Sequence, residues 1–159
     1  MPTKKLAQGA LIGALYALLT LVAAPISSGL MQIRISEGLC VLPFFTPAAA
    51  PGLFLGCLVA NLITGAMWMD VVFGSLATLL AAFLTHMVKK WGLSKWLAPA
   101  PAVIVNGVVV GVLLCYVYQV GVDVWTCMAY VAAGQAIACY GVGMPLMAAL
   151  ERFGKNLFA

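Results

Sequence analysis

The sequence predicts an all-α integral membrane protein, built as a bundle of six transmembrane helices. Its 159 residues are 65% hydrophobic and only 8% charged, whereas a soluble protein carries about 25% charged residues. So few polar side chains do not cover a water-soluble globule, and a lipid bilayer must be the solvent. No linker rich in Ser, Gly or charge divides the chain, so residues 1–159 are expected to form a single transmembrane domain.

Basic residues gather in three places along the chain, and their positions predict the topology. The three clusters are Lys4 with Lys5, then Lys89 and Lys90 with Lys95, then Arg152 with Lys155. The positive-inside rule places all three in the cytoplasm, which requires an even number of crossings between neighbouring clusters. Both termini are then cytoplasmic, while Glu37, Asp70 and Asp123 lie at or near the outer surface of the plasma membrane.

Apolar segments fit six spans between these clusters. The first four are residues 6–24, a short one over about 37–46, then 51–69 and 71–88. The first is too long for a signal-peptide core of roughly 7–15 residues. Pro25 ends it, and Pro47 and Pro51 bracket the turn after the second span. A two-span start with a re-entrant segment has the same parity and stays an alternative.

Two more spans are expected between residues 97 and 150, and they meet at residues 121–123. Each stretch is long enough for the roughly 20 residues that a bilayer demands. Tryptophan prefers the headgroup region. Trp68 and Trp125 fall on the expected outer side, and Trp91 and Trp96 flank the inner lysines. All four therefore agree with the same topology.

The motifs of common enzymes are missing from the sequence. It contains no GxxxxGK[ST], HExxH or GxSxG motif, its one histidine is His86, and its acidic residues are dispersed. Five cysteines form no CxxC pair, so metal and disulfide roles are not expected. We predict no enzymatic activity, no cofactor and no nucleic-acid partner.

Polar residues at bilayer depth are the most informative, because an amide in hydrocarbon must find a partner. Three amides fall within the expected spans, and a polar cap is expected above them. The amides are Asn61, Asn106 and Gln135; the cap residues are Arg34, Glu37, Trp68 and Asp70. Hydrogen bonding between helices explains each amide alone. Together they could instead bind a solute with several donors and acceptors.

Small residues follow helical spacing in the first span. One row is Gly9, Gly13 and Ala17, and the next is Ala10 and Ala14. Such flat faces permit close helix approach, either within the chain or onto a separate membrane subunit. For the similar rows of Gly52 with Gly56 and of Gly107 with Gly111, internal packing is expected.

Two long strings resemble the QueT family. Residues 34–61 read RISEGLCVLPFFTPAAAPGLFLGCLVAN and residues 70–78 read DVVFGSLAT. The likeness is densest between Arg34 and Thr85, and the length and span pattern extend it over almost the whole chain. The family comprises substrate-binding S components of energy-coupling-factor importers, assigned to queuosine precursors.

The resemblance implies a six-helix substrate-binding domain that captures its solute outside. It implies docking through helix 1 onto a transmembrane T component, with two ABC-type ATPases driving reorientation. The superfamily's AxxxA motif matches Ala10-Leu-Ile-Gly-Ala14. Queuine, its 7-deazaguanine precursors and the nucleoside all stay as candidate solutes. An S component for another vitamin-like solute and a structural membrane subunit are the alternatives; a secondary transporter is disfavoured because no span contains an ionisable relay.

The residues suggest how a flat base would be recognised. Glu37 or Asp70 would accept hydrogen bonds from adjacent N–H groups, and Trp68 would offer a stacking surface. Glu37 is the preferred candidate, because it follows Arg34 by one helical turn and the two side chains could pair.

Overall fold

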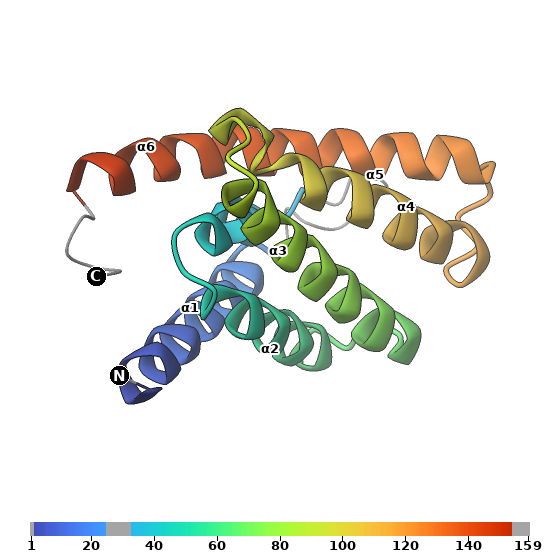
Figure 1. Ribbon diagram of the computed structural model, residues 1–159. Coiled ribbons are helices and arrows are strands. Elements are labelled where there is room, and N and C mark those ends of the chain that lie inside the picture. Colours follow the sequence, from blue (N-terminus) through green and yellow to red (C-terminus); the bar gives the residue numbers. More distant parts are fainter. Residues whose placement is uncertain (1, 25–32, 154–159) are drawn as a thin grey trace.

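The computed structural model describes residues 2–24 and 33–153, and within these ranges every regular element is a helix (Figure 1). The α-helices are α1 (Pro2–Val22), α2 (Ala49–Ile63), α3 (Ser75–Lys90), α4 (Ala100–Tyr116), α5 (Val124–Ala138) and α6 (Met144–Phe153). The 3₁₀ helices are η1 (Ile35–Phe44) and η3 (Lys95–Leu97), and the π-helical segments are η2 (Asp70–Gly74) and η4 (Cys139–Gly143). Each π segment continues directly into the neighbouring α-helix.

Four helical stretches in the described ranges are long and apolar enough to cross a bilayer. They are Thr3–Val22, Asp70–Lys90, Lys95–Tyr116 and Val124–Phe153. Two shorter apolar helices, η1 and α2, complete the bundle. The predicted all-helical fold, with helices able to cross a membrane, is thus confirmed, whereas the count of six crossings stays a prediction.

The short helices differ in their limits from the predicted spans. Helix α2 begins at Ala49, so Pro51 lies in its first turn, where a missing N–H breaks no helical hydrogen bond. The helix ends at Ile63, well before residue 69, and Gly65 then takes a positive φ of 70° that favours glycine. Pro25 and Lys155 lie outside the described residues.

Helix η1 is a 3₁₀ helix of ten residues with Pro43 inside it. A 3₁₀ helix rises about 2.0 Å per residue, compared with about 1.5 Å in an α-helix, so ten residues extend roughly 20 Å. The tighter winding lets a short segment run deep through the bundle. Its residues from Ser36 to Pro43 are all buried.

The helices form two close pairs, α1 with α2 and α4 with α5, and α3 contacts a member of each pair (Figure 1). A Cβ atom on Gly52 would overlap the backbone of Gly9, and one on Gly111 would lie 2.6 Å from the Cα of Met128. Only glycine permits such approaches. The predicted internal packing of the glycine rows on α2 and α4 is therefore confirmed.

The bundle is apolar outside, and its largely apolar interior also holds buried polar side chains. Large aliphatic side chains such as Leu11, Leu80 and Ile104 are at least half exposed, whereas Asn61, Asn106 and other polar side chains are nearly inaccessible. An apolar outer surface suits a lipid surround.

Contacts between the segments that connect the helices show which helix ends lie at the same end of the bundle. Lys95, before α4, pairs with Glu151 of α6 at 2.7 Å, and Lys89 lies 5.6 Å from the centroid of the Phe44 ring at the end of η1. At the opposite end, the Met67 N–H donates to the Tyr118 hydroxyl at 3.4 Å. The basic residues of the α3–α4 connection therefore lie at the same end as the close of α6, away from the α2–α3 and α4–α5 connections.

Candidate functional site

Buried polar side chains from six helical segments meet at the centre of the bundle. They are Tyr16 (α1), Glu37 (η1), Asn61 (α2), Asp70 (η2), Asn106 (α4) and Gln135 (α5), each at most 4% exposed. Four of them, Glu37, Asp70, Asn106 and Gln135, line a central cavity of about 10 Å³, close to the minimum that holds one water molecule. Its lining comprises Arg34, Glu37, Cys57, Asp70, Gly74, Thr78, Asn106, Val110 and Gln135. We call this the central cavity.

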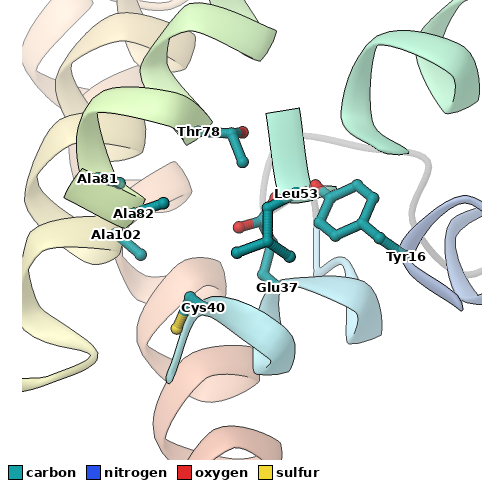
Figure 2. A pocket seen from close by; sticks show the side chains of 8 residues that line it. All are labelled: Tyr16, Glu37, Cys40, Leu53, Thr78, Ala81, Ala82 and Ala102. Carbon is teal, nitrogen blue, oxygen red and sulfur yellow. Dashed lines mark hydrogen bonds between the residues drawn. The ribbon is translucent and has the colours of Figure 1, made fainter. Parts of the chain in front are cut away.

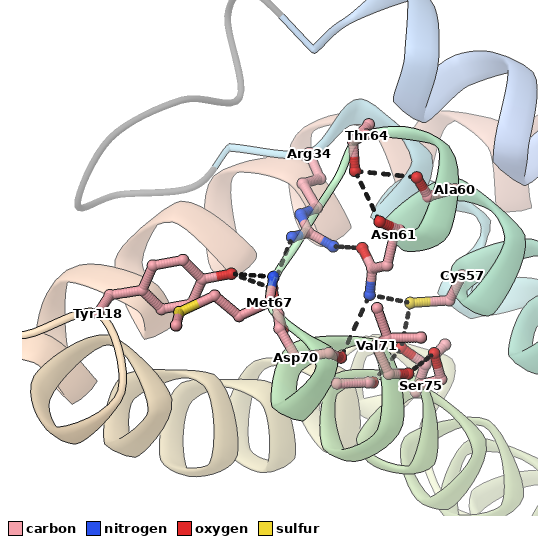
Figure 3. A network of polar contacts seen from close by, with 12 residues as sticks. Arg34, Cys57, Ala60, Asn61, Thr64, Met67, Asp70, Val71, Ser75 and Tyr118 are labelled. Atoms are coloured by element: carbon pink, nitrogen blue, oxygen red, sulfur yellow. Dashed lines mark hydrogen bonds and ion pairs between the residues drawn. The ribbon is translucent and has the colours of Figure 1, made fainter.

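One side of the cavity is an ionic cluster, the Arg34 cluster, which comprises Arg34, Asn61, Asp70 and Tyr118 (Figure 3). The Arg34 guanidinium lies 3.7 Å from Asp70 Oδ2 and donates to Asn61 Oδ1 at 3.1 Å. Asn61 Nδ2 in turn donates to the backbone carbonyl of Asp70 at 3.3 Å. The amide therefore links the guanidinium to the backbone that carries the carboxylate.

Tyr118 closes this cluster from the α4–α5 connection. Its hydroxyl donates to Asp70 Oδ2 at 3.2 Å and accepts from the backbone N–H of Met67. Burial, followed by the negative charge of Asp70, raises the pKa of Tyr118 above its usual value. The phenol therefore stays protonated at neutral pH and remains a donor to Asp70.

The other side of the cavity is the Glu37 cluster, which comprises Tyr16, Glu37, Asn106 and Gln135. Figure 2 shows Tyr16 of α1 and Glu37 of η1 turned toward each other, and the Tyr16 hydroxyl donates to Glu37 Oε1. Asn106 Nδ2 donates both to Glu37 Oε2 and to Gln135 Oε1, each at 3.3 Å. A chain of hydrogen bonds thus runs from α1 through η1 and α4 to α5.

Two buried acceptors at the cavity have no hydrogen-bond partner among the described residues: Asp70 Oδ1 and Asn106 Oδ1. Both residues line the central cavity. Buried polar atoms of native proteins are nearly always paired, and an unpaired one needs an explanation. The cavity therefore has acceptor capacity that the described protein groups do not use.

Six of the seven solute-site residues expected from the sequence meet here, but two expected arrangements do not occur. Arg34 pairs with Asp70 and Asn61 rather than with Glu37, because it precedes η1 in an extended conformation (φ −98°, ψ 110°) and not on its first turn. Trp68 is 66% exposed in the α2–α3 connection and does not line the central cavity.

Glu37 and Asp70 are both buried inside the bundle, at only 3% and 2% exposed. Their burial is tolerated because charged and hydroxyl donors surround them: Arg34 and Tyr118 at Asp70, and Tyr16 and Asn106 at Glu37. Asp123 is exposed, and its position on the outer side of the membrane stays a prediction.

Sequence reasoning missed both tyrosines. Tyr16 lies four residues before Thr20, and both are buried on the inner face of α1, where the Thr20 hydroxyl donates to Ser36 Oγ at 2.8 Å. A polar pair at helical spacing in the first span was a usable signal. Tyr118 had no such signal, because its role depends on the fold of a connection.

The two rows of small residues on α1 face different surroundings. Gly9, Gly13 and Ala17 are buried, and the two glycines pack against α2. Ala10 and Ala14 are exposed. An apolar groove of about 220 Å³ runs beside them, lined by both rows together with Leu55, Gly56 and Val59 of α2.

Comparison with known proteins bears out the resemblance seen in the sequence. A family model with the description "QueT transporter" matches residues 6–152. The queuosine precursor transporter QueT of Lactococcus lactis subsp. cremoris is 36% identical over 72 residues, which cover 44% of this chain and 42% of that protein. The alignment thus spans less than half of that relative. No solved structure matches the chain.

Proposed function

Because the chain belongs to the QueT transporter family, we propose that it is the substrate-capture (S) subunit of an energy-coupling-factor importer. It binds a queuosine precursor, queuine or a 7-deazaguanine, in the central cavity. The observation that carries this proposal is the set of buried polar side chains, with two unpaired acceptors, inside an otherwise apolar bundle. A purely structural membrane subunit has no need of such a cavity.

The proposal includes six crossings, with η1 and α2 as the two short ones. The N- and C-termini then lie in the cytoplasm, and the solute enters from the outer end, where the α2–α3 and α4–α5 connections meet. The contact between Met67 and Tyr118 ties these two connections together above the Arg34 cluster. A solute must part them, or pass beside them, to reach the cavity.

Docking onto the T component uses the outward row of α1. Ala10 and Ala14 are exposed beside the apolar groove between α1 and α2, so a partner helix could approach closely. Two ABC-type ATPases, bound to the T component, supply the energy. This chain carries no ATP-binding motif and needs no cofactor of its own.

Titration calorimetry of the detergent-purified protein tests solute binding. Queuine, its 7-deazaguanine precursors and the nucleoside are titrated separately, with adenine and riboflavin as controls. We expect saturable binding of at least one queuosine precursor and none of the controls. Preferential binding of a control would support an S component for another solute. If no compound binds, and mass spectrometry finds no small molecule released from the purified protein, a structural subunit is favoured.

A second experiment tests docking. Ala10→Trp or Ala14→Trp should abolish uptake and leave solute affinity within about three-fold, about 0.7 kcal/mol, because a bulky ring separates helix surfaces without reaching the cavity. Leu15→Trp, on a lipid-exposed position of the same helix, is the matched control and should retain uptake. Loss of solute affinity in purified Ala10→Trp would show that this face packs within the chain and would overturn the docking assignment.

A further inference from the structure

We propose that Asp70 and Asn106, rather than Glu37, receive the hydrogen-bond donors of the solute, and that the site selects a heterocyclic base with two neighbouring N–H donors. This inference rests on the proposed function and assigns roles within its site. It starts from the two buried acceptors, Asp70 Oδ1 and Asn106 Oδ1, that no described group satisfies.

The orientation of Asn106 is fixed by its neighbours. Its Nδ2 faces two oxygens, Glu37 Oε2 and Gln135 Oε1, each at 3.3 Å. Rotating the amide would bring Oδ1 against both of these oxygens, which repel it. Asn106 therefore keeps Oδ1 free as an acceptor in a residue that lines the cavity, and Glu37 is the positioning residue that holds it so.

Asp70 is held in the same way. Arg34 and Tyr118 both contact Oδ2, so Oδ1 remains available. Gly74, one turn along the π segment, lies close to this oxygen and has no side chain: a Cβ atom there would overlap Oδ1 at 2.6 Å. Glu37, by contrast, already has a donor on each oxygen, Tyr16 on Oε1 and Asn106 on Oε2.

Charge points to the same class of solute. Two carboxyl groups and one guanidinium line the cavity, and the guanidinium is already paired with Asp70 and Asn61. Such a site disfavours an anionic solute and favours one that is neutral or cationic and rich in donors. A 2-amino-4-oxo pyrimidine edge, with a ring N–H beside an exocyclic amino group, presents two adjacent donors to two acceptors.

The test compares 7-deazaguanine with 7-deazahypoxanthine, which lacks the exocyclic amino group. Calorimetry of the wild-type protein should give an affinity ratio of at least about 30-fold in favour of 7-deazaguanine, the lower end for losing a donor to a charged partner. One of Asp70→Asn and Asn106→Leu, at the residue that accepts from the exocyclic amino group, should reduce the ratio to below about five-fold, about 1 kcal/mol. The other variant removes the acceptor of the ring N–H and should weaken both bases alike. Glu37→Gln keeps both solute acceptors but leaves one oxygen for the Tyr16 and Asn106 donors, so it should lower the ratio less than the variant at the acceptor of the amino group.

Gly74→Ala provides a second variant that keeps every charged group. Its methyl group would overlap Asp70 Oδ1, so the carboxylate must turn from its present position, and 7-deazaguanine binding should weaken at least ten-fold, about 1.4 kcal/mol. Gly141→Ala is the matched control, since a Cβ atom there meets no atom within 4 Å. Thermal unfolding of each purified variant checks that it is folded.

The outcomes separate the two proposals. If the wild-type protein binds neither these bases nor queuine, the proposed function fails and the inference fails with it. If the bases bind, but the ratio survives in both Asp70→Asn and Asn106→Leu, or falls further in Glu37→Gln than in either of them, the inference alone is overturned. A Gly74→Ala protein that binds 7-deazaguanine like the wild type also counts against it.

Discussion

Tyr16 shows how one hydroxyl joins the first helix to the centre of the bundle. Its ring is 1% exposed on the inner face of α1, and its hydroxyl donates to Glu37 of η1, which Asn106 of α4 also contacts. Because both groups are buried, a hydrogen bond to the carboxylate is strong, and its loss leaves an acceptor unpaired. The Tyr16 hydroxyl is therefore a structural link between α1 and the Glu37 cluster.

Tyr16→Phe tests this link. We expect the free energy of unfolding in detergent to fall by about 1–3 kcal/mol, because Glu37 Oε1 loses its donor while the ring still fills its place. Tyr130→Phe is the control: Tyr130 is 44% exposed, and its hydroxyl should not matter. Equal thermal stability of the Tyr16→Phe and wild-type proteins would show that the hydrogen bond contributes nothing to stability.

Several buried positions could be predicted from the sequence, and others could not. Asn61, Asn106 and Gln135 were predictable, since an amide in an apolar span must find a partner. The pairing of Arg34 was not, because sequence spacing favoured Glu37 while the extended backbone before η1 directs Arg34 to α2 and η2. Burial of the Asp70 carboxylate likewise depends on donors from two separate segments, Arg34 before η1 and Tyr118 after α4.

At the scale of the element, local sequence determines the flat faces of α1 and the start of α5. The spacing of small residues in α1 predicted two flat rows, and the fold places one row inside and leaves the other exposed. Helix α5 begins where Asp123 caps it: one carboxylate oxygen accepts from the Thr126 N–H at 3.0 Å and the other from the Thr126 hydroxyl. Asp123 thus acts as an N-cap, a position that aspartate strongly prefers.

The cap of α5 should make stability depend on pH. The Thr126 hydroxyl and the Thr126 backbone N–H lower the pKa of Asp123. A lowered pKa means that the stabilising contribution is present above the unfolded value of about 3.9 and is lost as the pH falls through the folded value. The Tm of the wild type should therefore exceed that of Asp123→Ala at pH 7, and the difference should narrow below about pH 4.

Asp123→Asn separates capping from charge. Asparagine also caps helices but does not titrate in this range. Its Tm difference from Asp123→Ala should therefore persist at low pH, measured in the same detergent and buffers. A wild-type Tm advantage over Asp123→Ala that stays constant from pH 7 to below pH 4 would argue against the cap.

At the scale of the whole molecule, the charged residues and the side-chain contacts distinguish the same two ends of the bundle. Lys95 meets Glu151 at one end, and Met67 meets Tyr118 at the other. Trp91 and Trp96 lie in the same α3–α4 connection as Lys95, whereas Trp68 and Trp125 border the opposite connections, and all four are exposed. The charge pattern predicts which connections share an end of the bundle. This arrangement depends on where the charged residues fall in the sequence and not on how side chains pack.

Thiol labelling in intact cells tests the orientation. Cysteines Cys40, Cys57, Cys127 and Cys139 are buried, so Cys115→Ala serves as a background that should not label. In it, Asp123→Cys should react with an impermeant reagent, and Lys95→Cys should react only after permeabilisation. Both should label in detergent, which controls for accessibility. Labelling of Lys95→Cys but not Asp123→Cys in intact cells would reverse the topology.

The small size of the central cavity has a consequence for the rate of binding. Sites for small molecules usually enclose about 300–1,000 Å³, and here only about 10 Å³ lies open among the lining residues. If the helices must separate before a base enters, the observed rate constant should rise with solute concentration and then level off at the opening rate. Trp68, exposed two residues before Asp70, is placed to report the event by stopped-flow fluorescence. An opening equilibrium of this kind lowers the apparent affinity by the fraction of molecules that are open, so a mutation that loosens the bundle could tighten binding without touching the solute.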